Sequence, residues 1–137
     1  MARENVKRAD IKALLARKMQ KEADLLKTHE IFVPSLDAVL VFRRPPDGVL
    51  LDTIDEMGDE SSTRQAMEAM KHLIYRSCDL LQSPELQKEL NVVDPFDTVD
   101  AIFDLKDITV ISGELMEKFG LGDVEERVKN SSSATPA

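Results

Sequence analysis

The hydrophobic positions of this chain recur at three- and four-residue steps along most of its length. The first such stretch covers about residues 5–27 and contains neither Gly nor Pro. Its apolar residues fall on one face of a helix, with Lys and Arg on the other faces. They are Ile11, Leu14, Leu15, Met19, Ala23 and Leu26. The pattern predicts an amphipathic N-terminal helix.

The hydrophobic period changes at Glu30, where two β-prone runs follow each other. Residues 31–33 and 39–42 are rich in Ile, Phe and Val, and residues 34–37 between them have turn character. This pattern predicts a hairpin at about residues 30–43 with a loop longer than two residues. Two strands alone are marginal in water, so the hairpin must pack on helices or accept strands from another chain.

Five further helices are predicted between Asp47 and Phe119, and the clearest is a central helix that begins after Ser62. The positions expected to face the core are Leu50, Leu51, Ile54 and Met57; Ala66, Met70, Leu73, Ile74, Ser77 and Leu81; Leu86 and Leu90; Phe96, Val99, Ile102 and Phe103; and Ile108, Ile111, Leu115 and Phe119. Each set recurs at helical spacing.

Capping residues set the expected ends of these helices. Asp47 and Ser62 are candidate N-caps, and Gln65 completes a capping-box pattern with Ser62. Ser83-Pro84-Glu85 and Asp94-Pro95-Phe96 each combine an N-cap with Pro at the first helical position. The last helix is expected to start near Asp107. Gly58 and Gly120 are placed to end helices.

These elements predict a mainly helical α+β fold, a single compact helical domain at residues 1–130 with one small hairpin. One more helical turn is expected within residues 123–129. Residues 131–137 are small and polar, and we expect them to form a disordered tail. At 137 residues the chain is long enough to bury a stable core without disulfide bonds. Because only 4% of the residues are aromatic, we expect that core to be mainly aliphatic.

Charge is distributed unevenly along a chain whose net charge is −8. Residues 1–27 hold eight Lys/Arg and four Asp/Glu, a net of +4, which leaves −12 on residues 28–137. The acidic body repels phosphate and argues against nucleic acid as the main partner. The single Cys78 suits a reducing compartment, and no apolar run has the length of a signal or membrane segment. We therefore expect a cytoplasmic protein with no membrane partner.

Candidate chemistry is sparse. His29 and His72 have no Cys or His at ligand spacing, and Cys78 on a helical face is typical of a small core residue. The carboxylates of residues 52–60 lack the spacing of a calcium loop, and the five Gly residues form no phosphate loop. The sequence predicts no catalytic residue, no metal site and no cofactor, although catalytic groups can converge from distant positions.

A series of short motifs runs along the chain in a fixed order. It consists of Val33-Pro34-Ser35-Leu36, Arg43-Arg44-Pro45, Pro84-Glu85-Leu86-Gln87, Pro95-Phe96-Asp97-Thr98-Val99, Phe119-Gly120-Leu121-Gly122 and Lys129-Asn130. In order and spacing the series resembles the XkdN-like family, the tail assembly chaperones of siphophages and defective prophages of Gram-positive bacteria. Each motif is short, and the resemblance rests on their colinear order over about residues 30–130. One departure is Lys106-Asp107, where many relatives carry Gly-Glu.

The resemblance implies a non-enzymatic role in phage tail assembly in the bacterial host cytoplasm. Such chaperones bind the long, helical tape measure protein, help to recruit tail tube subunits, and leave before the virion matures. In many phages a programmed frameshift adds an extension that contacts the tail tube protein. The alternative is a structural tail completion or adaptor protein that stays in the virion.

The N-terminal helix and the hairpin are the expected partner-binding surface, for the tape measure protein or for a homo-oligomer. The helix carries the chain's positive excess, and the hairpin needs a support. We select Leu15 and Met19 on the helix and Phe32 and Phe42 on the hairpin as anchors. The competing interpretation is that all four side chains belong to the core.

Overall fold

The structure is a computed structural model that describes residues 6–58 and 62–121. In chain order its elements are α1 (Ile11–Leu25), β1 (Thr28–Val33), the 3-10 turn η2 (Pro34–Leu36), β2 (Ala38–Arg43), α2 (Asp47–Met57), α3 (Thr63–Ser77), the 3-10 turn η3 (Leu80–Gln82), α4 (Pro84–Leu90), α5 (Asp97–Ile102) and α6 (Leu105–Lys118). The predicted mainly helical fold with one small hairpin is confirmed. The turn expected within residues 123–129 and the tail at 131–137 lie outside the described residues.

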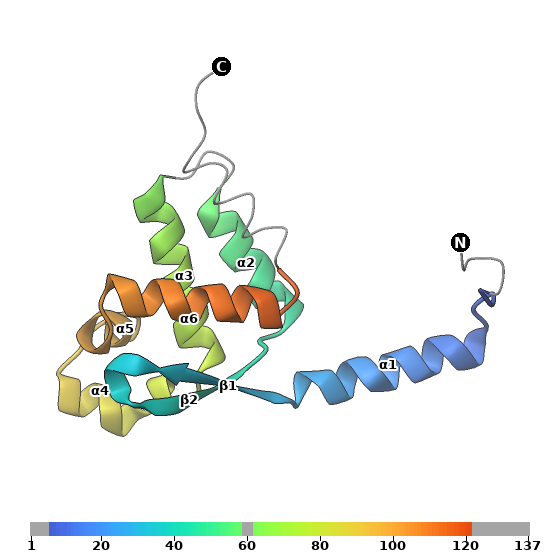
Figure 1. The fold of residues 1–137 in the computed structure, drawn as a ribbon, viewed down its shortest axis with the longest axis horizontal. Coiled ribbons are helices and arrows are strands. Elements are labelled where there is room, and N and C mark those ends of the chain that lie inside the picture. The colour runs from blue at the N-terminus through green and yellow to red at the C-terminus, as the bar shows by residue number, and fades with distance from the viewer. Residues whose placement is uncertain (1–5, 59–61, 122–137) are drawn as a thin grey trace, which may run out of the picture.

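Helix α3 is the centre of the fold. It packs against α2, α5 and α6, and α6 crosses it on the side that carries the hairpin (Figure 1). Leu73 and Ile74 are completely buried, as the helical spacing predicted. The helix ends at Ser77, whose hydroxyl donates to the carbonyl of Leu73 at 2.6 Å. Leu81 is also buried as expected, but it belongs to the separate turn η3.

The hairpin lies with one face on the helices and the other face toward solvent. β1 and β2 pair antiparallel, with Ile31 opposite Leu40 and Val33 opposite Ala38, so residues 34–37 form the predicted longer loop. β1 lies against α6, which supports a sheet of only two strands. The inward side chains are Ile31, Val33, Leu40 and Phe42. Those on the outer face are Glu30, Phe32, Val39 and Val41.

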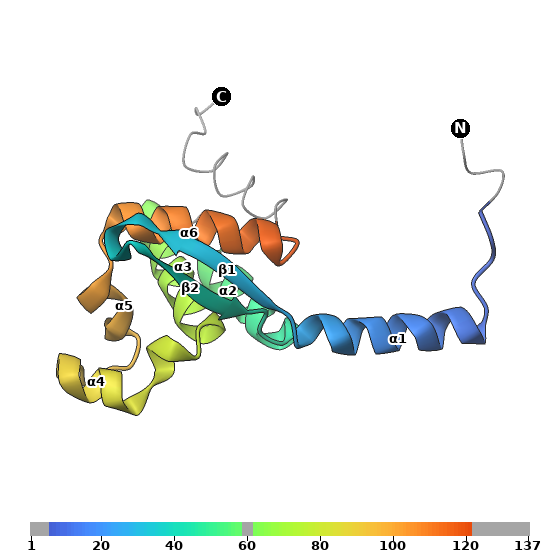
Figure 2. The ribbon, with the colours of Figure 1, turned by 60° about the horizontal axis from the view of Figure 1, so that its bottom comes forward.

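Helix α1 extends away from the rest of the fold (Figures 1 and 2). It begins where the carboxylate of Asp10 accepts a hydrogen bond from the amide of Ala13 at 2.8 Å, so its start is capped locally. None of its residues is buried. The predicted helix at about residues 5–27 is therefore present over a shorter range, and its apolar side chains Ile11, Leu14, Leu15 and Met19 are exposed rather than buried.

One expected core position of α2 and the expected start of α5 differ from the structure. Leu51 is 59% exposed, whereas Thr53 is buried and donates its hydroxyl to the carbonyl of Val49 at 3.1 Å. α2 packs mainly on α3, so only a narrow stripe of α2 reaches the core. α5 begins at Asp97, because the carboxylate of Asp94 accepts from the amide of Phe96 in a turn before the helix.

Both ends of α6 are fixed by local contacts, and the sequence singled out Asp107 at one end and Gly120 at the other. Asp104 and Asp107 form a reciprocal capping box, so the helix begins at Leu105, two residues before the expected start. At the other end Gly120 has a φ of 76°, and the amide of Leu121 donates to the carbonyl of Met116 at 2.7 Å. This is the left-handed glycine ending that the sequence predicted.

Candidate protein-binding surface

The most exposed apolar surface of the described chain lies on α1. Ile11, Leu14, Leu15 and Met19 are each more than half exposed, and we call these four residues the α1 stripe. Leu15 and Met19 follow Ile11 at successive four-residue steps, so they form one row along the helix. Ion pairs such as Lys18 with Glu22, 3.2 Å apart, occupy solvent-facing positions on the same helix. An amphipathic helix with an uncovered apolar row is the usual form of a helix that binds another protein.

A second apolar surface lies on the outer face of the hairpin. Phe32, Val39 and Val41 project from it and are about half exposed. Beside β2 the surface is hollowed by a groove of about 550 Å³. Val39 and Val41 line this groove together with Leu26 and Leu80, both of which are strongly exposed. The outer face of the hairpin is therefore continuous with an apolar groove.

Three of the four predicted anchors lie on these surfaces, and one does not. Leu15, Met19 and Phe32 are exposed, so they are available to a partner. Phe42 is 0% exposed and belongs to the hydrophobic core, which removes it from the candidate surface. Because side chains alternate along a strand, Phe42 shares the inner face with Leu40. The alternation of residues 39–42 was visible in the sequence, but which face would meet the helices was not.

Val39, Val41, Leu26 and Leu80 were not selected from the sequence. The period-two alternation that groups Val39 with Val41 could have found those two. Leu26 belongs to the apolar positions at helical spacing in the N-terminal segment, but no pattern in the sequence groups it with Leu80. The two residues line one groove because the fold brings η3 beside β2.

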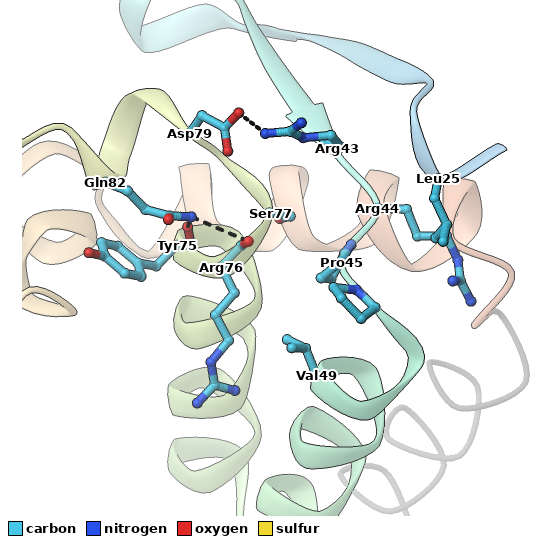
Figure 3. Close-up of a pocket in the computed structure, with 11 residues that line it drawn as sticks. Leu25, Arg43, Arg44, Pro45, Val49, Tyr75, Arg76, Ser77, Asp79 and Gln82 are labelled. Carbon is cyan, nitrogen blue, oxygen red and sulfur yellow. Dashed lines mark hydrogen bonds and ion pairs between the residues drawn. The ribbon is translucent and has the colours of Figure 1, made fainter. Parts of the chain in front are cut away.

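A smaller hollow of about 420 Å³ lies where β2 leads into α2 and α3 ends (Figure 3). Its polar groups largely bind one another. The amide of Gln82 donates to the carbonyls of Tyr75 and Arg76 at the end of α3, and Arg43 forms an ion pair with Asp79. These contacts fix the end of α3 relative to β2. They leave no nucleophile next to a base, so the hollow suggests a structural role.

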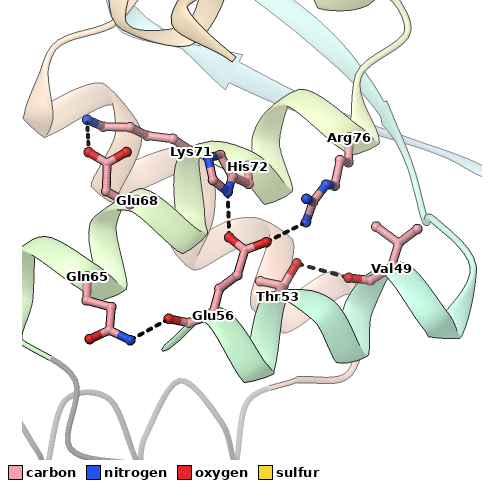
Figure 4. Close-up of polar contacts among 8 residues, drawn as sticks. All are labelled: Val49, Thr53, Glu56, Gln65, Glu68, Lys71, His72 and Arg76. Atoms are coloured by element: carbon pink, nitrogen blue, oxygen red, sulfur yellow. Dashed lines mark hydrogen bonds and ion pairs between the residues drawn. The ribbon is translucent and has the colours of Figure 1, made fainter. Parts of the chain in front are cut away.

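Polar side chains tie α2 to α3 on another face of the fold (Figure 4). The carboxylate of Glu56 lies 2.5 Å from Nδ1 of His72 and 3.0 Å from Arg76. The side-chain amide of Gln65 donates to the main-chain carbonyl of Glu56 at 2.8 Å. The hydroxyl of Ser62 accepts from the main-chain amide of Gln65, but the Gln65 side chain does not return to Ser62, so only half of the predicted capping box forms. His72 also lies on the ring of Phe96, with centroids 4.2 Å apart. His72 is therefore part of a helix-to-helix contact.

The remaining candidate groups from the sequence are the single cysteine and the acidic and histidine side chains. Cys78 is buried, and burial raises the pKa of its thiol, which disfavours the reactive thiolate. Within residues 6–58 and 62–121, no three His, Cys, Asp or Glu side chains are grouped so that they could hold a metal ion. In the same part of the chain, every helix is too short or too polar to cross a bilayer.

Comparisons of the chain with protein-family models, curated proteins and solved structures give no match.

Proposed function

We propose that the chain is a non-catalytic tail assembly chaperone that binds the tape measure protein through the α1 stripe and the outer face of the hairpin. The observation that carries the protein-binding part is that α1 is amphipathic yet buries none of its side chains. The order of motifs over about residues 30–130 supports the choice of client. The proposal includes a second step, in which this chain or a frameshifted longer form recruits tail tube subunits to the bound tape measure protein.

The shape of α1 suits a long helical client. Fifteen residues of helix extend about 22 Å, or four turns, and the α1 stripe runs along the N-terminal part of this length. A helical client with its own apolar stripe can pack along such a row by interlocking side chains. Charged residues on the other faces of α1 keep the free arm in water.

The expected strength of one contact is low. Burying a large apolar side chain contributes about 1.5–3 kcal/mol, and the four residues of the α1 stripe are already partly covered, so together they contribute roughly 4–8 kcal/mol. Association costs are of similar size, at about 4–15 kcal/mol. A single arm therefore binds weakly, whereas many copies along one client gain avidity. Weak, repeated contacts also allow a chaperone to leave when the tube forms.

Co-expression with the tape measure protein tests the proposal. Leu15→Glu with Met19→Glu places two charges in the α1 stripe and should return the client to the insoluble fraction. Ala13→Glu with Ala16→Glu adds the same charge to exposed positions on the other side of α1 and serves as the matched control. Because α1 buries nothing, both double variants should keep the denaturation midpoint of the parent chain.

Two outcomes would redirect the proposal. A stripe variant that folds and still solubilises the client would place the client-binding surface elsewhere. Mass spectrometry of purified particles separates a chaperone from a structural tail component. The chaperone should be missing from mature tails, and its presence there would favour the completion or adaptor role.

A further inference from the structure

A basic groove of about 640 Å³ lies at the base of α1, where the arm meets the fold. Its lining residues come from α1, from the start of β1, from the junction of β2 with α2 and from the end of α6. The charged and titratable ones are Arg17, Lys21, Asp24, Lys27, His29, Arg44, Asp47 and Lys118. Phe119 contributes an apolar wall, with its ring 5.8 Å from that of His29 in an edge-on contact. The fold thus gathers cations as far apart in the sequence as Arg17 and Lys118.

The groove is positive within an acidic protein. Five Lys/Arg against two Asp give it a net charge of +3 with His29 neutral. The whole chain has −8, so the remaining residues carry −11. The two carboxylates are already engaged: Asp24 with Lys27 at 2.9 Å, and Asp47 with Arg44 at 2.8 Å and Lys21 at 3.6 Å. Hydrogen bonds from Lys27 and from Arg44 hold the pKa values of Asp24 and Asp47, respectively, below their ordinary range.

We propose that this basic groove binds a carboxylate-rich segment of a protein partner. A short acidic segment meets the five cations without extending onto the surrounding surface. A nucleic acid carries one charge every few ångströms along its length, so it would continue from the groove onto a body of net charge −11 and be repelled there. The groove shares no residue with the α1 stripe. Binding of an acidic segment here is therefore independent of the proposed contact between the α1 stripe and the tape measure protein.

His29 gives the groove a pH dependence. Its pKa lies below the ordinary 6.5, first because the ring is half-buried and then because Lys118 and Lys27 repel a positive imidazolium. The other charged groups of the groove are Arg17, Lys21 and Arg44, together with Asp24 and Asp47, which are ion-paired with neighbouring cations. Carboxylates of an occupant would favour the imidazolium and raise this pKa. By linkage, binding should tighten as the pH falls through the titration of His29.

The test uses the full chain and a fluorescein-labelled pentaglutamate peptide, with one side-chain carboxylate for each of the five cations. Binding is followed by fluorescence anisotropy at low salt. Lys27→Gln with Lys118→Gln removes two cations from the groove and should weaken binding about tenfold, the sum of two partly exposed charge contacts. Lys12→Gln with Lys106→Gln makes the same change of net charge on α1 and α6 outside the groove, and should stay within about twofold of the parent. A labelled deoxythymidine decamer should bind more weakly than the peptide.

Nuclear magnetic resonance of the unaltered chain gives a readout that needs no variant. On addition of the peptide the pKa of His29 should rise, while His72, which lies outside the groove, serves as the internal reference. Equal loss of affinity in the two double variants would overturn the proposal, as would an unchanged pKa of His29 under saturating peptide. Tighter binding of the decamer than of the peptide would also overturn it and assign the groove to nucleic acid.

Discussion

Glu56 on α2 holds Arg76 on α3 through an ion pair of 3.0 Å. Both side chains are less than one-third exposed, and the guanidinium also lies 5.3 Å from the ring centre of Phe96. The same carboxylate contacts His72, so one acidic side chain serves two partners on the neighbouring helix. A half-buried carboxylate with two partners contributes more to the free energy of unfolding than an exposed ion pair. Its loss leaves both His72 and Arg76 without their hydrogen-bond partner.

Glu56→Gln should therefore lower the free energy of unfolding by about 1–2 kcal/mol, since it removes the charge but keeps the shape. Urea denaturation followed by circular dichroism measures the change. Glu68→Gln is the control: its partner is Lys71 at 3.0 Å, but the Glu68 side chain is half exposed, so the cost should stay under about 0.5 kcal/mol. Equal effects at the two sites would mean that the α2–α3 contact does not depend on Glu56.

The two phenylalanines of the hairpin should respond differently to truncation. Phe42→Ala removes a fully buried ring and should cost about 3–5 kcal/mol. Phe32→Ala removes a ring that is 53% exposed on the outer face and should cost under about 1 kcal/mol. Thermal or chemical denaturation of the pair decides the orientation of the hairpin. The reverse order would show that the sheet presents its other face to the core.

Leu73→Ala and Ile74→Ala should each destabilise the fold by about 2–4 kcal/mol, because both side chains are completely enclosed by the core. Leu51→Ala deletes the same kind of side chain from an exposed position on α2, and we expect a change within about 0.5 kcal/mol. Denaturation midpoints at the three sites provide the measurement. A large loss at Leu51 would restore the core position that its spacing first predicted.

Two glycines should give opposite results when replaced by alanine. Gly120 has a φ of 76°, which strains any side-chain-bearing residue, so Gly120→Ala should cost about 1–2 kcal/mol. Gly48 lies in the first turn of α2, and a Cβ added there would meet no atom within 4 Å, so Gly48→Ala should stabilise by up to about 1 kcal/mol. Melting temperatures of the two variants should move in opposite directions. A shift in the same direction would contradict the left-handed ending of α6.

The stability of the fold should depend on His29 between neutral and mildly acidic pH. Burial and the nearby Lys118 and Lys27 hold the pKa of His29 below 6.5 in the folded chain, so the unfolded chain takes up the proton first as the pH falls. The contribution of neutral His29 is complete above 6.5 and is lost as the pH falls through its lowered pKa. The parent chain should lose more stability than His29→Gln between about pH 7.5 and pH 5.5. If the free energy of unfolding of the parent chain and of His29→Gln changed with pH in parallel, His29 would not have this role.

The sequence alone determined the local elements of this protein and most of its core. Helical spacing fixed the buried row of α3 and α6, because a helix with one apolar stripe has only one face to bury. Leu73, Ile74, Ile108 and Leu115 are buried as that spacing predicted. Gly120 ends α6 as expected, since the conformation it adopts is a local property of the backbone.

Only the tertiary structure decided which apolar faces stay uncovered. Leu15 and Phe42 both lie in locally apolar patterns, but α1 extends from the fold and leaves Leu15 in solvent, whereas Phe42 lies on the inner face of the hairpin, within the core. The basic groove is a further example, because Lys21 and Lys118 are brought to one hollow by the packing of distant elements. Periodicity says that a face is apolar or charged. Whether that face meets another part of the chain depends on contacts between segments far apart in sequence, which no local pattern encodes.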